Sequence, residues 1–486
     1  MIKKSFIWLI ILMSVPCVTF AQGTFRDAYN DFKRQAQTEY EDFRRNANQE
    51  YAKWMRQAWE MYGKIPATPV PKDDMLPPIE YDKEKDKQSP TPLPYDEVEP
   101  TPAPEPQPLP IAPIRENDGD FHGVKFNYYG TELSVRLPQN YKFSIKGKTE
   151  EAYANAWEEL SSEDFDNLIR DCLLIRIEHQ LNDWAYLMML GQMSEAICGK
   201  STNEAVMMQA FVYCQSGYKI RLGLSANNDL HLLFQTKHII LGMDGFNMKD
   251  GLFYSLKPVD DKGLKVCDIS FPEEKPLSLI INQEMLLADN LSAERELIPQ
   301  GVTSGIKSQV NKNLIDFFNE YPTSVINDNF ITRWAMYANM PLSSQVKKKL
   351  YPQLIAVIDG LSKAEAAQTL LYWVQTAFVY EYDDKVWGND RAFFAEETLY
   401  YPYCDCEDRS ILFSRLVRDL LGLEVMLVYY PGHLATAVAF NTPVEGDYID
   451  LKGKHFTICD PTYIGAPVGA TMPEMDNKTA KVIVVN

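Results

Sequence analysis

The last quarter of the chain alternates between helix-like and strand-like spacing of apolar residues. Residues 406–421 carry apolar side chains three and four positions apart, and this pattern stops at Gly422. Three segments rich in β-branched and aromatic residues follow, separated by turn residues: 423–430, 433–440 and 454–459. The pattern predicts a helix followed by antiparallel strands, which is an α+β domain, and we place its bounds at 291–486.

Three residues with nucleophilic or acid–base chemistry lie at the ends of these predicted elements. Cys406 is at the helix start after the N-cap candidate Asp405, His433 is at a strand start, and Asp460 is at a strand end. A helix N-terminus stabilises a thiolate, so we expect a lowered pKa for Cys406. Cys406, His433 and Asp460 in this order fit a Cys-His-Asp catalytic triad, in which the acid orients the imidazole and the imidazole assists the thiol.

The same residues resemble the transglutaminase-like branch of the papain-related cysteine enzymes. The segments concerned are Asp405-Cys406-Glu407-Asp408, Gly432-His433 and Asp460-Pro461-Thr462, and the chain has Cys404 where that family commonly has Gly. The resemblance covers roughly residues 360–486. It implies a thioester acyl-enzyme that passes to water, as in a peptidase or amidase, or to an amine, as in a crosslinking transglutaminase. Hydrolysis is our prediction, with a protein or peptide as substrate and no cofactor. The family also contains inactive binding proteins.

A further candidate for the site lies on an upstream helix. Ser362-Lys363-Ala364-Glu365 is a capping box that opens this helix, and Gln375 lies near its end. A side-chain amide that reaches the thiol would stabilise an oxyanion, so Gln375 is a candidate donor. A solvated helix glutamine is the alternative.

Two other interpretations of the C-terminal motifs stay open. A zinc site would use Cys404, Cys406, His433, His455 and Cys459, although the paired Cys-x-x-Cys spacing of structural zinc sites is missing. A catalytically silent domain that keeps the fold for binding is the other. We predict no metal.

The middle of the chain, residues 120–290, is predicted to be a second α+β domain. Its helix, glycine and strand follow one another as in the C-terminal domain. A shift of 205 residues places Gly217 on Gly422 and Ser201 on Cys406, with His231 three residues from the slot of His433. These matches suggest a degenerate copy of the same fold that has lost the nucleophile.

The N-terminus has the features of a secretory signal peptide. Residues 1–21 combine a basic start, a short apolar stretch and a small-x-small cleavage site, Thr19-Phe20-Ala21. No later segment is apolar enough to enter a membrane. We therefore expect a periplasmic or secreted protein, of bacterial type, with no membrane insertion after signal cleavage.

An 11-residue repeat follows the signal peptide. Tyr29, Tyr40, Tyr51 and Tyr62 are eleven residues apart, and further aromatic, arginine and alanine positions repeat in step. Eleven residues make three helical turns, so the repeat predicts one helix over 22–64 with an aromatic stripe. The stripe over residues 24–64 is either a surface for self-association or partner binding, or it lies on the globular part of its own chain.

The segment 65–119 is predicted to be a disordered linker. Fifteen of the thirty prolines lie between Pro66 and Pro113. Such a composition favours an extended polyproline-type spacer that holds the helix at a distance from the globular part.

Charge and cysteine content narrow the class of partner and the redox state. With 48 basic and 67 acidic residues the net charge is −19, which argues against nucleic acid and anionic membranes as partners.

Of the eight cysteines, Cys17 falls in the signal peptide, which leaves seven, an odd number. At least one thiol therefore stays unbridged, as a nucleophile requires.

Overall fold

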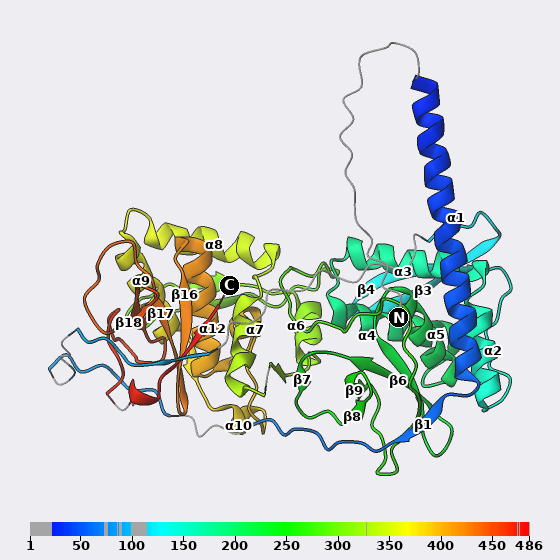
Figure 1. Ribbon diagram of the computed structural model, residues 1–486. Helices are drawn as coiled ribbons and strands as arrows, with labels where there is room; N and C mark the ends of the chain where they lie inside the picture. Colours follow the sequence, from blue (N-terminus) through cyan, green and yellow to red (C-terminus); the bar gives the residue numbers. More distant parts are fainter. Residues whose placement is uncertain are drawn as a thin grey trace.

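The computed structural model describes residues 22–71, 76–84, 86, 90–98, 114–326, 328–473, 475 and 477–485. The predicted signal peptide, residues 1–21, lies outside this part of the chain. Two six-stranded sheets, each accompanied by helices, lie side by side, and one long helix projects from the first of them (Figure 1). The fold is α+β, as the sequence predicts. Among the helices in these ranges, none is both long and apolar enough to cross a bilayer.

The long helix α1 (Gln22–Met55) is shorter than the repeat predicts. It ends at Met55, and Trp59–Tyr62 forms strand β1, which pairs antiparallel with β10 (Leu264–Cys267). The prediction of a helix through residue 64 is wrong there because the main chain is used in a sheet. The side chains of the first repeat unit, such as Tyr29, lie outside the described residues.

Only the last turns of α1 pack on the globular part. Ala47 and Tyr51 are buried there, whereas the stripe residues Tyr40, Phe43 and Trp54 remain 41–47% exposed. Figure 1 shows the first half of the helix projecting beyond the domain. The helix thus lies on its own chain at one end, and self-association through the exposed stripe stays a prediction.

The middle half follows α1 in the chain. It contains the predicted domain, residues 120–290, and extends to the end of β12 at Ser308. A hairpin of β3 (Phe121–Tyr128) and β4 (Thr131–Pro138) precedes its helices. The remaining elements are α2 (Glu150–Leu160), η1 (Glu163–Phe165), α3 (Asp166–Glu178), α4 (Asp183–Cys198), α5 (Asn203–Gln215), β5 (Ile220–Leu224), β6 (Leu230–Gln235), β7 (Ile239–Ile240), β8 (Gly245–Met248), β9 (Gly251–Ser255), β11 (Arg295–Leu297) and β12 (Ile306–Ser308). The strand order of the main sheet is β1-β10-β5-β6-β9-β8.

The C-terminal half carries the predicted triad. Its helices are α6 (Lys312–Asn319), η2 (Phe330–Thr332), α7 (Arg333–Asn339), α8 (Ser344–Ile358), α9 (Lys363–Ala377), α10 (Asp383–Val386), α11 (Ala395–Tyr400), α12 (Cys406–Leu416), the π-turn η3 (Val417–Leu421) and η4 (Asn477–Thr479). Its strands are β13 (Ser324–Val325), β14 (Val379–Tyr380), β15 (Tyr403–Cys404), β16 (Val425–Tyr430), β17 (His433–Val438), β18 (Tyr448–Leu451), β19 (Lys454–Cys459) and β20 (Lys481–Val484). The main sheet has the order β18-β19-β17-β16-β20-β2, where β2 is Asp96–Val98.

The two main sheets share one topology. In both, a helix leads into a hairpin of two central strands, a second hairpin adds on one side, and a later strand adds on the other. Strands β5, β6, β8, β9 and β10 thereby correspond in order to β16, β17, β18, β19 and β20. The sixth strand of each sheet comes from the N-terminal segment, β1 in one and β2 in the other. This common order supports the predicted copy of the fold.

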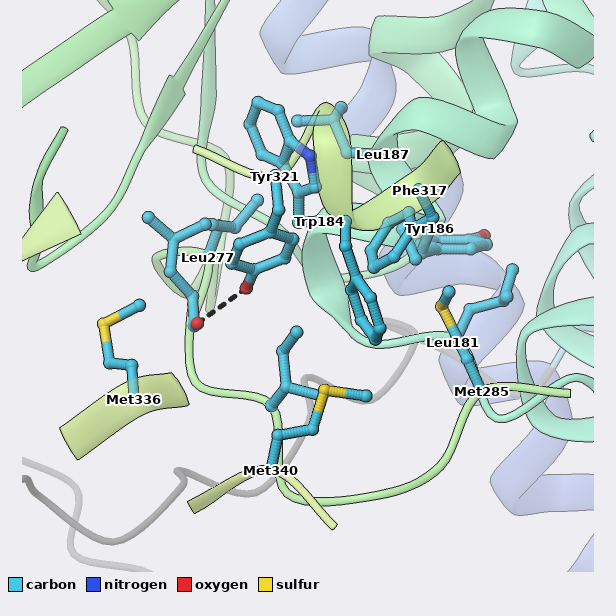
Figure 2. Packing of buried hydrophobic residues seen from close by; sticks show 14 of the residues in the cluster. Leu181, Trp184, Tyr186, Leu187, Leu277, Met285, Phe317, Tyr321, Met336 and Met340 are labelled. Carbon is cyan, nitrogen blue, oxygen red and sulfur yellow. Dashed lines mark hydrogen bonds between the residues drawn. The ribbon is translucent and has the colours of Figure 1, made fainter. Parts of the chain in front are cut away.

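One hydrophobic core runs through both halves. Trp184 of α4 and Tyr321, and Met336 and Met340 from α7 and its end, all belong to this core, and Figure 2 shows them in one close view of it. The hydroxyl of Tyr321 donates to the Leu279 carbonyl oxygen at 2.6 Å. The halves are thus packed together rather than linked loosely.

The proline-rich segment lies on the two sheets, which corrects the predicted disordered spacer. Thr68 pairs with Leu241 in the middle half, and Leu93 and β2 pair with the C-terminal sheet. Figure 1 shows this segment running from one half to the other. Its backbone is ordered because carbonyl and N–H groups between the prolines complete the sheet edges. Residues 99–113 of the predicted linker lie outside the described residues.

The docking of α1 depends on a buried amide, which gives a test of this fold. Asn48 is 1% exposed; its Oδ1 accepts hydrogen bonds from Trp157 Nε1 (2.9 Å) and Gln215 Nε2 (3.0 Å), and its Nδ2 donates to Gln215 Oε1 (3.0 Å). We expect Asn48→Ala to lower the free energy of unfolding by about 2 kcal/mol, since both partners lose their bonds in a buried place. Urea unfolding measures this. Asn46→Ala, on the exposed face of the same helix, is the control, and equal losses for the two variants would contradict the docking.

Candidate active site

The elements that carry the three predicted residues form where the sequence places them. Helix α12 begins at Cys406 after the N-cap Asp405, and its π-turn ends at Gly422, whose φ of +62° suits glycine. Strand β17 begins at His433, and Asp460 follows the last residue of β19. These predicted positions are confirmed.

Strand pairing brings the histidine and the acid to the same end of the sheet. Thr436 of β17 lies opposite Cys459 of β19, so His433 and Asp460 both lie just beyond this pair. His433 Nε2 and Asp460 Oδ2 are 2.8 Å apart, and both side chains are almost fully buried. The second carboxylate oxygen accepts the N–H groups of Thr462 (2.8 Å) and Tyr463 (3.2 Å). The carboxylate is therefore fixed by its own turn and in turn fixes the imidazole.

The other imidazole nitrogen is available for chemistry. His433 Nδ1 is buried and has no hydrogen-bond partner among the described residues. With Nε2 bonded to a carboxylate, the proton is favoured on Nε2 and the lone pair on Nδ1. Such a nitrogen can accept a proton from a nearby thiol.

Cys406 lies on the face of α12 that covers the start of β17. Ser410, one turn further along that face, donates to the Leu434 carbonyl oxygen at 2.8 Å. The backbone N–H of Leu434 points at the Cys406 sulfur and favours its thiolate, which opposes the other effects on the pKa of this thiol. The structure thus brings the Cys406 sulfur to the main chain of the residue next to His433, and all three predicted side chains are buried.

The protonation state of Cys406 differs from the expectation. Burial raises the pKa of the Cys406 thiol well above its usual value, and the Glu407 and Asp405 carboxylates raise it further. The thiol donates to Glu407 Oε2 at 3.3 Å. The prediction of a lowered pKa is wrong for this conformation, because burial and two neighbouring carboxylates outweigh the helix N-terminus and the Leu434 N–H.

The second cysteine of the motif is also held as a thiol. Burial raises the pKa of Cys404 to about 11, although Arg409 opposes this effect. Its sulfur lies 3.9 Å from the Val379 carbonyl oxygen. Every cysteine from Cys172 to Cys459 is a thiol, so the motif cysteines are not consumed in a disulfide.

Gln375 is placed differently from the prediction. Its amide nitrogen donates to the carbonyl oxygens of Asp460 (2.9 Å) and Ala466 (3.3 Å), and its amide oxygen accepts the Gly465 N–H at 3.2 Å. These side-chain hydrogen bonds hold Asp460 and the loop that follows it. Gln375 is therefore a positioning residue for the acid rather than an oxyanion donor in this conformation.

Arg409 of α12 contacts residues from an earlier part of the chain. Its guanidinium lies 5.3 Å from the centre of the Tyr380 ring and donates to the Gln375 (3.1 Å) and Phe378 (2.8 Å) carbonyl oxygens at the end of α9. Burial raises the pKa of the Tyr380 hydroxyl. No local pattern around Arg409 predicts these contacts, which only the fold shows.

Buried carboxylates next to Cys406 are the groups that could hold a metal ion. Asp383, Asp405 and Asp408 offer oxygens within 4.8 Å of one another, and so do Asp383, Asp390 and Glu407. An all-oxygen set of this kind suits a hard divalent cation such as Ca²⁺ rather than zinc. Burial, followed by the charge of Glu407, raises the pKa of Asp383 to about 8, and the pKa values of Asp405 and Asp408 are also raised by burial and mutual repulsion.

The middle half has no such triad at the matching positions. Ser255 of β9 lies opposite Leu233, as Cys459 lies opposite Thr436, so Leu230 corresponds to His433 and Leu256 to Asp460. Asn203, the first residue of α5, corresponds to Cys406, and its Oδ1 accepts the Leu230 N–H at 2.8 Å. The sequence comparison, which was aligned on Gly217 and Gly422, placed Ser201 there; it is two residues off because the helical stretch from Cys406 to Leu421 is longer than α5.

Comparisons of the chain with protein-family models, with curated proteins and with solved structures give no match.

The buried carboxylates predict a pH dependence of stability. A folded-state pKa of about 8 for Asp383 lies above the unfolded value of about 4, so the folded protein binds the proton more tightly. Stability should therefore fall as pH rises from about 4 to 8 and level off above. Thermal unfolding followed by circular dichroism should show Tm falling by a few degrees between pH 5.5 and 8.

The test variant is Asp383→Asn, and the matched control is Asp384→Asn, because Asp384 is the next residue in the chain and is exposed. Asp383→Asn keeps an acceptor for the Arg391 N–H, which Asp383 bonds at 2.6 Å, but cannot titrate. It should flatten the fall in Tm, whereas Asp384→Asn should not. The same slope in both variants would contradict the raised pKa of Asp383.

Proposed function

We propose that this chain is an exported cysteine amide hydrolase of the transglutaminase-like type, with Cys406 as nucleophile, His433 as base and Asp460 as orienting acid. The observation that carries the proposal is the 2.8 Å bond from His433 Nε2 to Asp460, which leaves Nδ1 unbonded on a strand that α12 covers with Cys406. The motif resemblance supports it independently.

The reaction that these groups support is acyl transfer. His433 Nδ1 takes the thiol proton as the Cys406 sulfur attacks an amide carbonyl carbon, and backbone N–H groups at the start of α12 stabilise the oxyanion. The C–N bond then breaks, the proton passes from His433 to the leaving amine, and a thioester remains. Water, activated by His433, hydrolyses the thioester and restores the thiol. An amine in place of water would give a crosslink, which is the transglutaminase outcome of the same intermediate.

The thiol is neutral in the conformation described, so activity requires the site to open. Opening would hydrate Glu407 and Asp405 and reduce their effect on the pKa of the Cys406 thiol. A protein or peptide substrate that enters the site is the natural cause of such a change.

Export of the protein is supported by residues 1–21, which have the features of a signal peptide.

The raised pKa of the Cys406 thiol favours a second candidate function. In that case the C-terminal half keeps the fold without chemistry, as the middle half does with Asn203, and serves as an interaction module of the bacterial envelope. Substitutions of the triad separate the two functions.

Triad substitutions should abolish turnover of peptide amides without unfolding the chain. In Asp460→Asn the amide oxygen takes the place that accepts the Thr462 and Tyr463 N–H groups, so the NH2 group faces His433 Nε2 and favours the wrong tautomer. The value of kcat should therefore fall by about 10,000-fold, as for the serine-protease change of this kind. Cys406→Ala should leave no turnover. Both are measured by mass spectrometry of peptide cleavage in casein digests, with a fluorescent amine added to detect crosslinking.

Cys404→Ala is the matched control, because Cys404 lies two residues away and its sulfur faces Val379. We expect it to retain turnover. Activity that survives Cys406→Ala or Asp460→Asn would exclude the triad, and a native chain without any turnover would leave the silent interaction module as the better function.

A further inference from the structure

Two loops flank the triad, and one segment of the N-terminal region binds both. Gly432 immediately precedes His433, and Ile464 lies four residues after Asp460. The N–H of Leu76 donates to the Gly432 carbonyl oxygen at 2.9 Å, and the N–H of Tyr81 donates to the Ile464 carbonyl oxygen at 2.9 Å. Residues 76–81, which we call the strap, therefore span from the histidine loop to the acid loop.

The pairing with the acid loop has the pattern of a parallel β-bridge. Glu80 is paired with Ile464, whose N–H donates to the Ile79 carbonyl oxygen at 2.8 Å. The strap is thus bound by its main chain, as an added strand is. Pro77 and Pro78 lie between the two contact points and favour an extended backbone.

A third contact reaches the cysteine side of the site. The Tyr380 hydroxyl donates to the Leu76 carbonyl oxygen at 3.4 Å, and the Tyr380 ring lies 5.3 Å from the guanidinium of Arg409 on α12, the helix that begins at Cys406. The strap therefore contacts Gly432 next to the histidine, the acid loop at Ile464, and Tyr380, which packs on the first turn of the cysteine helix.

Four of the six side chains of the strap are half-buried. Leu76, Ile79 and Tyr81 pack against the apolar cluster of the C-terminal sheet, and Pro78 is also half-buried, whereas Pro77 and Glu80 are exposed. The Tyr81 ring packs edge-on against Tyr463 with centroids 5.4 Å apart. Main-chain bonds together with pockets for some of the side chains are the usual way in which an extended peptide is recognised.

We infer that the strap occupies the groove in which this enzyme binds an extended peptide substrate, and that its own residues 76–81 hold the triad in a closed, latent state. The inference rests on the proposed function for the identity of the site. A substrate would take the same main-chain bonds to Gly432 and Ile464, present its carbonyl to the Tyr380 hydroxyl, and place apolar side chains where Leu76, Ile79 and Tyr81 lie.

The closed state of the site follows from the way in which the strap is tethered to the two sheets. The strap is anchored on one side by β1 in the middle sheet and on the other by β2 in the C-terminal sheet, so its local concentration at the groove is high. Cys406, His433 and Asp460 are each no more than 2% exposed while the strap is bound to the loops next to the last two of them. Displacement of the strap, by a competing peptide or by cleavage of the segment, would expose them.

The test removes the two donor N–H groups of the strap in the full chain. Leu76→Pro and Tyr81→Pro, combined, cannot donate to Gly432 and Ile464, and proline is compatible with the extended backbone. We expect iodoacetamide to label Cys406 at least about tenfold faster in the double variant than in the native chain, as judged by peptide mass spectrometry. A synthetic peptide of residues 76–84, added in excess, should slow the labelling again.

Glu80→Pro is the matched control, because it adds a proline to the same strap while the N–H groups of Leu76 and Tyr81 keep their acceptors. It should label like the native chain. Hydrogen exchange of residues 76–84 and the Tm show that the double variant has released the strap and kept the fold. Unchanged labelling of Cys406 with a released strap would overturn the inference.

Tyr81→Ala serves as a second variant if the double proline variant unfolds, since it removes only the ring contact with Tyr463. The same criteria apply to it. If a strap variant labels faster at Cys406 but turns over no peptide, the groove stands and the proposed hydrolase is refuted. If the native chain turns over peptides but release of the strap leaves the labelling of Cys406 unchanged, only the groove is refuted.

Discussion

The antiparallel pairing of β17 with β19 is the constraint on which the site depends. It places Thr436 opposite Cys459, and this register brings His433 and Asp460 together at one end of the sheet. A slip by one residue would turn His433 to the opposite face and break the 2.8 Å bond to Asp460. Around this pair, Gln375 binds the loop after Asp460 and Ser410 of α12 binds Leu434, so helix and loop are both positioned by the same two strands.

Burial of like charges sets the chemical state of the nucleophile. Asp383, Asp405 and Asp408 are packed beside Cys406 with Glu407, and the pKa values of the three aspartates and of the thiol are all raised. In water a helix N-terminus would favour the thiolate, but it acts here against desolvation and negative neighbours. Cys406 is therefore a neutral thiol in this structure.

The two halves show that this fold can exist with and without the triad. The middle sheet has the strand order of the C-terminal one, and Asn203 takes the place of Cys406 with a hydrogen bond to the start of β6. Leucines stand where the histidine and acid would be. The N-terminal segment completes both sheets, with β1 in one and β2 in the other, so a single stretch of chain joins the scaffold to the site.

Local sequence determined the secondary structure near the triad. The helix start at Asp405-Cys406, its end at Gly422, the strands on either side of Pro431-Gly432 and the capping box of α9 follow from spacing, capping and turn chemistry, and all are confirmed. The positions of His433 and Asp460 at the ends of neighbouring strands follow from the sequence, and the structure joins these two side chains by a hydrogen bond.

Contacts between distant segments were decided only by the tertiary structure. Composition predicted a free spacer at residues 65–119, yet hydrogen bonds to Gly432 and Ile464, far along the chain, order residues 76–81. The end of α1 at Met55 depends on β10, and the role of Gln375 depends on a loop some ninety residues away. The thiol pKa likewise depends on burial and on charges brought together by folding, which no local pattern of residues reveals.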